Sequence, residues 1–373
     1  MARILIDARK LRSSTGRYVR ELLSRLEHID SDNQYVVLGN AADFSANGEH
    51  CWQPAAPNFT TVICDIPHYT FREQLLLPLL LYRCKPDLVH FWMPQQPLLY
   101  LGKKVATIHD LHYVQLKIYN RGKITYEIRQ LIFKIFLKLV ARTNKALITP
   151  TVYTKKELVG YTHCDPSKVV VTHEGASEEL THALEPCPAM VGKQFLLYVG
   201  QSAEYKGQME LIKALQILRR QYPALELAVV GKPNSYTEYL ERTVRTAGYQ
   251  GVQFLGFLPD TQLAWLYCHA ATYVQPSRSE GFGLMNLEAM MCGCPVASSN
   301  ATCLPEVCGA AAEYFDPLDP EDMARAIHMI LSSGDHADRL RQLGYEQVKK
   351  YSWERMAMQT LAIYQQTLRS YTG

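Results

Sequence analysis

The 373-residue chain has no long uninterrupted apolar run. Its longest apolar stretches, 75–82 and 131–140, are short or contain lysine, whereas a membrane-spanning helix needs ~18 uncharged apolar residues. The segment 1–10 has too short an apolar core for a secretion signal. We therefore expect a cytoplasmic protein, a location that still allows peripheral contact with the inner face of the cytoplasmic membrane.

The ten cysteines include no Cys-x-x-Cys pair. The closest two, Cys292 and Cys294, are separated by one residue. Structural zinc sites need regularly spaced ligands, and disulfides are rare in a reducing compartment. We therefore expect reduced, buried thiols and no metal site.

The net charge of +3 is unevenly distributed along the chain. Residues 1–172 hold 23 Lys and Arg against 14 Asp and Glu, a net charge of +9. The remaining residues hold 16 against 22, a net charge of −6. The first half is therefore suited to an anionic partner, and the second half is not.

Both halves alternate short apolar runs with helical patterns. In the first half we predict a helix over 18–26 and strands over 3–7, 35–38, 87–92, 105–109 and 146–149. In the second half we predict helices over 209–220 and 263–268 and strands over 195–200, 225–230, 253–255, 271–275 and 295–298. Continuous apolar strands between helices indicate parallel sheets that are buried on both faces.

This pattern predicts an α/β fold of two doubly wound domains, in agreement with the chain length. The periodicity is interrupted over 172–193, where two prolines and Gly192 occur. We therefore place the domains at 1–172 and 173–352. Doubly wound sheets bind ligands at the carboxyl ends of their strands, so we expect the site in a cleft between the two domains.

The segment 276–293 carries the clearest chemical pattern. A strand ends near Gln275, and a helix begins near Gly283 or Leu284. The N–H groups at a helix start favour an anion, and Gly281 and Gly283 let the backbone approach it closely.

Two glutamates flank this helix start. Glu280 precedes it and Glu288 lies one turn inside it, so we expect their carboxylates ~10 Å apart. A nucleotide-sugar fits this arrangement, with pyrophosphate at the helix start and the hydroxyls of ribose and sugar on separate carboxylates. The spacing alone fits two solvated surface glutamates equally well.

The segment from Glu280-Gly-Phe-Gly-Leu284 to Glu288-Ala-Met resembles the Glu-x7-Glu signature of retaining glycosyltransferase family 4, which has the GT-B fold. The resemblance covers nearly the whole chain and is most specific in its second half. Within the family, the chain resembles bacterial cell-surface polysaccharide mannosyltransferases. The other segments that carry it are 16–20, 107–110, 198–200, 206–207, 254–259, 300–306 and 315–320.

The resemblance implies two Rossmann-like domains with distinct roles. The N-terminal domain, 1–172, would bind the acceptor, and the C-terminal domain, 173–352, would bind the nucleotide-sugar. The terminal helix, 353–373, would cross back onto the first domain. Many family members also carry an arginine where this chain has Gln201. One positive charge that would contact the donor diphosphate is therefore either missing or supplied by another residue such as Arg278 or Arg17.

The resemblance also implies roles for individual residues. Lys206 would stabilise the leaving diphosphate as a point charge, His109 would face the donor sugar, and Glu280 would hold that sugar. Glu288 would bind ribose. The N–H of Gly16, at the start of the first helix, could meet phosphate, although a simple turn explains this glycine equally well. The whole expected donor-binding set is Gly16, Gln201, Lys206, Gly231, Leu258, Glu280, Gly281, Phe282, Gly283, Leu284 and Glu288.

A basic stretch lies between residues 119 and 145, with seven Lys and Arg and one acid among apolar residues. Arg129, Lys134 and Lys138 are candidates for contact with an anionic membrane or the acceptor, at ~1 kcal/mol for each basic residue. A core helix with a solvated basic face fits the same pattern. Nucleic acid is not expected as a partner, because no stacking platform or nucleic-acid-binding motif accompanies the charge.

We predict a retaining hexosyltransferase that uses no cofactor and no metal, because lysine and backbone N–H groups neutralise the phosphates. The resemblance favours GDP-mannose as donor and a glycan or lipid-linked glycan of cell-surface polysaccharide biosynthesis, such as lipopolysaccharide, as acceptor. A UDP- or dTDP-linked hexose is the alternative donor. A nucleotide-sugar epimerase and a non-catalytic subunit of a polysaccharide-assembly complex are the alternatives from other classes.

Overall fold

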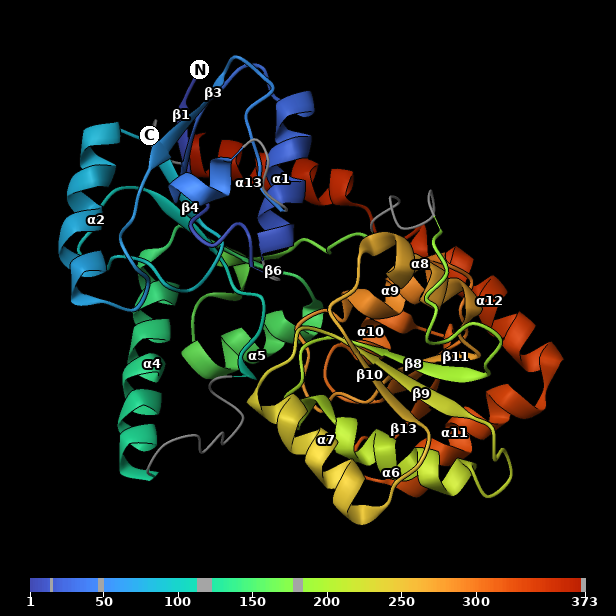
Figure 1. Ribbon diagram of the computed structural model, residues 1–373. Coiled ribbons are helices and arrows are strands. Elements are labelled where there is room, and N and C mark those ends of the chain that lie inside the picture. The colour runs from blue at the N-terminus through green and yellow to red at the C-terminus, as the bar shows by residue number, and fades with distance from the viewer. Residues whose placement is uncertain (14–15, 46–49, 113–122, 177–183, 370–373) are drawn as a thin grey trace. The chain divides into compact units, whose positions relative to one another are not determined.

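A computed structural model describes residues 1–13, 16–45, 50–112, 123–176 and 184–369, without the side chains of 123–126 and 128–129 (Figure 1). The chain divides into two compact units. The first consists of Met1–Glu174 with Ser352–Gly373, and the second of Gly175–Tyr351. The division lies two residues after the boundary expected from the sequence.

The first unit is built on a seven-stranded parallel sheet with the order β3-β2-β1-β4-β5-β6-β7. Its strands are β1 (Arg3–Asp7), β2 (Gln34–Gly39), β3 (Phe59–Ile63), β4 (Leu88–Phe91), β5 (Lys104–Thr107), β6 (Ala146–Thr149) and β7 (Val169–Val171). Its helices are α1 (Gly16–Ile29), α2 (Phe71–Cys84), α4 (Lys123–Thr143), α5 (Val152–Thr162) and α13 (Trp353–Arg369), with short 3-10 turns η1 (Ala41–Phe44) and η2 (Pro166–Lys168).

The C-terminal helix α13 packs against α1 in the first unit (Figure 1). Two polar contacts join it to residues that are distant in sequence, one on β4 and one just before β5. The Tyr364 hydroxyl lies 2.5 Å from Nδ1 of His90 on β4, and Lys103 Nζ donates to the Leu368 carbonyl at 3.1 Å. Helix α13 is therefore part of the first unit, although the whole second unit precedes it in the chain.

The second unit is built on a six-stranded parallel sheet with the order β10-β9-β8-β11-β12-β13. Its strands are β8 (Phe195–Val199), β9 (Glu226–Val230), β10 (Val252–Gly256), β11 (Thr272–Gln275), β12 (Val296–Ser299) and β13 (Ala312–Phe315). Its helices are α6 (Gln208–Leu218), α7 (Ser235–Ala247), α8 (Asp260–His269), α9 (Leu284–Met291), α10 (Leu304–Cys308), α11 (Pro320–Ser332) and α12 (Gly334–Val348), with the 3-10 turn η4 (Glu204–Lys206).

Hydrophobic side chains cover both faces of the second sheet. Alternate residues of a strand point to opposite faces, so Leu197 and Val199 of β8 join one buried cluster, whereas Leu196 and Tyr198 join another. Helix α9 contributes to the first cluster and helix α6 to the second. The helices that follow β8 and β11 therefore lie on opposite faces of the sheet.

The two parallel sheets confirm the predicted α/β fold of doubly wound domains. Several elements were not predicted, among them the edge strands β3 and β7 and helix α2. Only Phe59 of β3 and Val169 of β7 are buried, so these strands lack the apolar run of a central strand. Helix α2 contains Pro78 and exposes Leu75 and Leu79, which hides its helical period.

Within the described residues, no helix is both long and apolar enough to cross a membrane. None of the ten cysteines, all of which lie in this part of the chain, forms a disulfide.

The buried His90 predicts a pH-dependent stability. Desolvation by burial lowers the pKa of His90 to about 3, with a smaller contribution from His109. In the unfolded chain the ring takes up a proton below its ordinary pKa of about 6.5, so the unfolded state binds more protons between these values. The contribution of His90 to the free energy of unfolding is therefore fully present above pH ~6.5 and is lost as the pH decreases toward 3. The loss is about 2 kcal/mol between pH 7.5 and pH 5.

Urea unfolding of the wild-type protein and of His90→Gln, at both pH values, measures this effect. The glutamine cannot titrate, so the variant is expected to lack about 2 kcal/mol of the pH dependence. An equal pH dependence in the two proteins would contradict the buried neutral state of His90.

Candidate functional site

The strand order of the second sheet reverses between β8 and β11, and the loops after these two strands carry the candidate site. Lys206 ends the loop after β8, and Glu280 lies in the loop after β11. Lys206 Nζ and Glu280 Oε1 are 2.7 Å apart, with side chains 19% and 14% exposed. The structure therefore joins two predicted site residues that are 74 positions apart in the sequence.

Lys206 is held by the backbone and by an aromatic ring. The next residue, Gly207, has a φ of 71°, and a Cβ there would lie 2.1 Å from the Pro276 carbonyl oxygen. Lys206 Nζ also lies 5.2 Å from the centre of the Tyr205 ring. Burial works to lower the pKa of Lys206, but the Glu280 carboxylate outweighs burial and raises this pKa above its usual range. Lys206 therefore stays protonated beside Glu280.

Glu280 is oriented by contacts from three directions. Gln275 at the end of β11 donates from Nε2 to Glu280 Oε1 at 2.9 Å. The Glu280 N–H donates to the Thr302 hydroxyl at 3.2 Å, and the Cys303 thiol lies 3.2 Å from the Glu280 carbonyl oxygen. Lys206 and Gln275 both contact Oε1 of this carboxylate, and its second oxygen has no partner within the described chain.

Helix α9 begins immediately after these residues. Gly283 precedes it with a φ of 86°, which favours glycine, and the first N–H groups of the helix, at Leu284 and Met285, have no carbonyl within the helix to accept them. Gly281 lies between Glu280 and this start. The Phe282 side chain is only 4% exposed and packs edge-on against Tyr351, so it belongs to the hydrophobic core.

The loop after β8 also contains Gln201, whose side chain is exposed. A Cβ on Gly231, at the end of β9, would lie 2.2 Å from the Gly200 carbonyl oxygen, so glycine lets these two loops meet. Arg278, a candidate replacement for the family arginine, pairs with Glu210 at 2.7 Å. The other candidate, Arg17, lies in α1 of the first unit.

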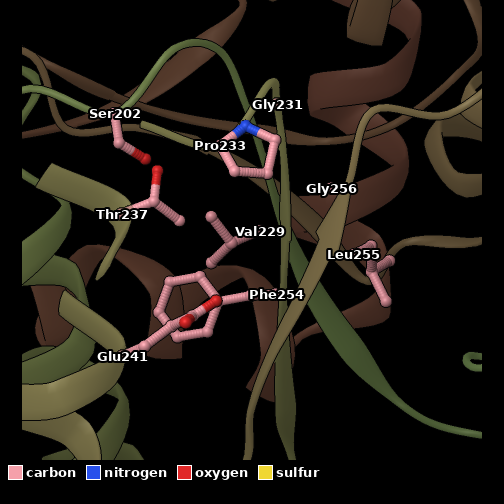
Figure 2. Close-up of a pocket in the computed structure, with 9 residues that line it drawn as sticks. All are labelled: Ser202, Val229, Gly231, Pro233, Thr237, Glu241, Phe254, Leu255 and Gly256. Atoms are coloured by element: carbon pink, nitrogen blue, oxygen red, sulfur yellow. The ribbon is translucent and has the colours of Figure 1, made fainter. Parts of the chain in front are cut away.

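A small cavity lies beside β9, β10 and α7 in the second unit (Figure 2). Its volume is about 220 Å³. It combines the Phe254 ring with the hydroxyls of Ser202 and Thr237 and the carboxylate of Glu241. The remaining lining residues are Val229, Gly231, Pro233, Leu255 and Gly256. Leu258 is half-buried and packs against the hydrophobic cluster that contains Leu197 and Val199. It does not line the cavity.

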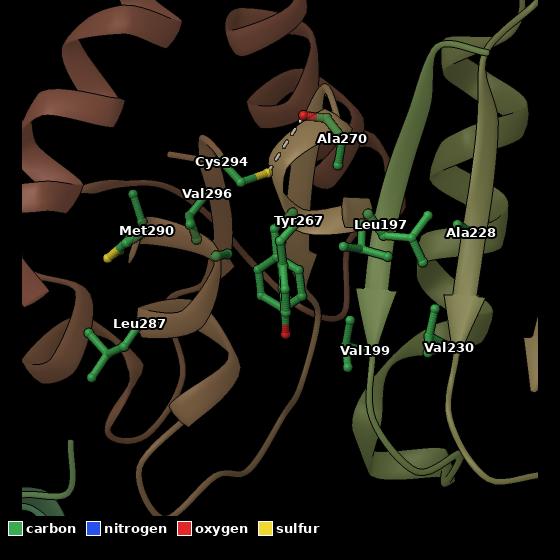
Figure 3. Close-up of a cluster of buried hydrophobic side chains, with 14 of the residues drawn as sticks. Leu197, Val199, Ala228, Val230, Tyr267, Ala270, Leu287, Met290, Cys294 and Val296 are labelled. Carbon is green, nitrogen blue, oxygen red and sulfur yellow. Dashed lines mark hydrogen bonds between the residues drawn. The ribbon is translucent and has the colours of Figure 1, made fainter. Parts of the chain in front are cut away.

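Glu288 is buried to 1% exposure, and its Oε2 accepts a hydrogen bond from the Tyr267 hydroxyl at 3.1 Å. Tyr267 lies in the middle of a hydrophobic cluster, between Leu197 of β8 and Val296 of β12 (Figure 3). The contact of Glu288 with Tyr267 joins α9 to α8. The two glutamates of the motif therefore have different surroundings, since Glu280 is partly exposed and Glu288 is enclosed.

In the first unit, His109 follows β5 and pairs with Glu174, which follows β7. His109 Nδ1 and Glu174 Oε1 are 3.2 Å apart. The Tyr18 ring meets the imidazole edge-on, with 4.7 Å between the ring centres. Gly16 starts α1, where its N–H donates to the Ser13 carbonyl at 2.9 Å. A Cβ on Gly16 would lie 1.9 Å from the Leu11 carbonyl oxygen, so the backbone itself requires glycine there.

The basic stretch lies on α4. Lys138 is exposed and Lys134 half-buried, and Lys138 Nζ lies 5.7 Å from the centre of the Tyr161 ring. The Arg129 side chain and residues 119–122 lie outside the described part of the chain. Exposed apolar residues interleave with the lysines, namely Leu131, Ile132, Ile135 and Leu139.

Several residues of these sites are not among those predicted from the sequence, including Glu174, Gln275, Tyr267 and Glu241. Gln275 ends a predicted strand, and a polar residue at the end of an apolar strand is a usable signal for a site. The other three come from distant segments and have no local pattern. Among the described residues, no group of three His, Cys, Asp or Glu side chains is placed to hold a metal ion.

Comparisons with known proteins agree with this architecture. Residues 15–180 match the family model described as Glycosyltransferase Family 4, and residues 188–347 match the model described as Glycosyl transferases group 1. A glycosyltransferase from Rickettsia africae has a similar fold, with a TM-score of 0.73 at 16% identity over 99% of both chains. The predicted GT-B fold class is thus confirmed.

Two curated relatives come from Escherichia coli. O-antigen chain mannosyltransferase B is 28% identical over 288 residues, which are 74% of this chain and 72% of that protein. Serotype-specific mannosyltransferase WbdA is 32% identical over 219 residues, which are 54% of this chain but only 26% of that protein. The two family models together span most of the chain, which therefore belongs to the glycosyltransferases that carry a family 4 domain followed by a group 1 domain.

Proposed function

We propose that the chain transfers a hexose from a nucleotide-sugar to a hydroxyl of a glycan or lipid-linked glycan, with retention of anomeric configuration. The observation that carries this proposal is the Lys206–Glu280 pair beside the start of α9, in a chain of a glycosyltransferase family. The names of the relatives favour mannose as the sugar and a surface polysaccharide as the product.

In the proposed reaction, the bond between the anomeric carbon and the diphosphate oxygen breaks while the acceptor oxygen bonds to the same carbon. The acceptor attacks from the face that the diphosphate leaves, and its proton passes to a phosphate oxygen. Negative charge develops on the diphosphate, and Lys206 together with the N–H groups at Leu284 and Met285 stabilises it. Because these groups supply the positive charge, the proposal requires no metal ion and no cofactor.

The two glutamates have separate roles in this proposal. Glu280 accepts sugar hydroxyls through Oε2, while Lys206 and Gln275 hold Oε1. Glu288 binds ribose, and a ribose hydroxyl reaches this carboxylate only after local side chains move, because its exposure is 1%. The exposed Gln201 donates a neutral hydrogen bond to the diphosphate in place of the family arginine.

The cavity at β9, β10 and α7 is the proposed base pocket, and its chemistry favours guanine. A carboxylate can only accept hydrogen bonds, and Glu241 has no partner within the described chain. Guanine offers it two adjacent donors, N1–H and N2–H, whereas uracil and thymine offer one donor between two carbonyl oxygens. Phe254 supplies an aromatic face for the base. GDP-mannose is therefore the proposed donor, with a UDP- or dTDP-linked hexose as the alternative.

We also propose that α4 contacts anionic lipids at the inner face of the cytoplasmic membrane, where a lipid-linked acceptor would be presented. Exposed Ile132 and Ile135 alternate with Lys134 and Lys138 on this helix. Apolar side chains can enter the headgroup boundary while lysines meet lipid phosphates.

The function is tested by incubating the protein with nucleotide-sugars and a mannoside acceptor, and following NDP release and product mass. We expect turnover with GDP-mannose, and Lys206→Ala is expected to lower kcat by ~10²–10³-fold, the effect of removing one transition-state charge donor. Lys193→Ala is the matched control, because Lys193 also pairs with a glutamate in the second unit, at 3.0 Å, and is expected to keep full kcat.

The same assay separates the rival functions. Conversion of the donor without any acceptor would identify an epimerase, and binding without turnover for any donor would identify a non-catalytic subunit. An unchanged kcat in Lys206→Ala would remove this residue from the proposed mechanism.

The base assignment is tested by the affinities for GDP and UDP. Glu241→Gln is expected to weaken GDP binding by roughly 10- to 100-fold, because the amide keeps one acceptor and places a donor against a guanine donor. UDP affinity is expected to stay constant or increase, since an amide can pair with both N3–H and O4 of uracil. Isothermal titration calorimetry measures both.

Glu238→Gln removes the same charge from an exposed position of α7 that does not line the cavity, and both affinities are expected to stay unchanged. Equal affinity of Glu241→Gln and wild type for GDP would refute the role of Glu241.

The membrane contact is tested by sedimentation with vesicles containing anionic lipid, in low salt. Replacing Arg129, Lys134 and Lys138 with glutamine is expected to cost ~3 kcal/mol of membrane affinity, or about 100-fold. The control replaces three cations of the second unit: Lys213, Arg220 and Arg242. Equal sedimentation of the α4 variant and the control would rule out this surface.

A further inference from the structure

His109 has one ring nitrogen engaged and one without a partner. Its Nδ1 faces Glu174 Oε1 at 3.2 Å. Its Nε2 is buried and has no hydrogen-bond partner within the described chain. Unpartnered buried nitrogens are rare in folded proteins, so this atom calls for an explanation.

The position of the ring is fixed from several sides. The Tyr18 ring meets it at 82° and the Trp92 ring at 66°, both edge-on. Glu174 is only 9% exposed and follows β7, whereas His109 follows β5, so β6 separates their strands in the sheet. The contact therefore depends on the parallel sheet rather than on local sequence, and it holds the imidazole in one orientation.

A carboxylate selects one tautomer of a neutral imidazole. Because a carboxylate can only accept a hydrogen bond, Nδ1 of the neutral ring must carry the proton beside Glu174, and Nε2 then carries a lone pair. The opposite tautomer would bring the Nδ1 lone pair against a negative oxygen at 3.2 Å. Glutamine at position 174 could pair with either tautomer, so only the carboxylate enforces this choice.

We propose that Glu174 is a positioning residue that fixes His109 as the Nδ1–H tautomer, so that Nε2 accepts a hydrogen bond from a sugar hydroxyl. The tautomer itself follows from the first unit alone, whereas the identity of the ligand as a sugar rests on the proposed function. The hydroxyl can belong to the donor sugar or to the acceptor, and the two sources are separated in the test.

The tautomer is measured by long-range ¹H–¹⁵N correlation spectra of the ¹⁵N-histidine-labelled full chain, in alkaline buffer. The His109 signals are those absent from His109→Asn. We expect a protonated Nδ1 and an unprotonated Nε2 in the wild-type protein. We expect Glu174→Gln to add signals of the Nε2–H tautomer, Glu174→Asp to retain the wild-type pattern, and the exposed control Glu127→Gln to leave it unchanged.

A protonated Nε2 in the wild-type protein would overturn the tautomer assignment without any variant, so the test does not depend on the folding of Glu174→Gln. A wild-type pattern retained in a folded Glu174→Gln would overturn the role of Glu174. Neither result depends on turnover, so both are distinguishable from failure of the proposed function.

Ligand titrations test the hydroxyl contact. GDP-mannose, GDP and methyl α-mannoside are added in turn, and the ¹⁵N shift of Nε2 is followed. A shift with GDP-mannose but not GDP identifies the donor sugar, and a shift with methyl α-mannoside identifies an acceptor hydroxyl. In either case Glu174→Gln is expected to reduce kcat/KM by roughly 2- to 10-fold, the loss of one hydrogen bond. No shift with any of the three would overturn the sugar contact.

Discussion

The parallel pairing of β8 with β11 is the constraint on which the second unit depends. The strand order reverses at this pair, and the helices that follow the two strands pack on opposite faces of the sheet. Their loops therefore separate at the carboxyl edge and leave room for side chains. Lys206 and Glu280 occupy that room, and Gly207 brings the first loop against the Pro276 carbonyl. A side chain at Gly207 would separate the loops and with them the two charges.

Exposure distinguishes this ion pair from the buried carboxylate–cation contact at the end of β1. In the first unit, Arg9 is 1% exposed and bonds to Asp7 at 2.7 Å and to Glu73 at 2.9 Å, so two carboxylates of the protein already hold its guanidinium. Lys206 has one carboxylate partner and a side chain that is 19% exposed. A buried cation that two carboxylates hold has a structural role, whereas a partly exposed cation can add an anionic ligand to its contacts.

The sequence predicted the fold class and the motif because both depend on local patterns. Apolar runs marked the central strands, and glycines beside Glu280 marked a helix start. What it could not predict are contacts between segments that only the sheet brings together, such as His109 with Glu174. It also could not separate the surroundings of the two glutamates of the motif, since the burial of Glu288 depends on Tyr267 of α8. Phe282 lies within the motif, yet its side chain belongs to the core.

The C-terminal helix has a role in the first unit beyond covering α1. The Thr107 hydroxyl at the end of β5 lies 2.8 Å from His90 Nε2 and 3.3 Å from the Tyr18 hydroxyl, and the other nitrogen of His90 meets Tyr364 of α13. All four side chains are buried. Such a network fixes the positions of its side chains, because a buried polar group that loses its hydrogen bond destabilises the fold. Tyr18 in turn contacts the ring of His109. Helix α13 therefore takes part in setting the position of His109, two residues after Thr107, although it is the last helix of the chain.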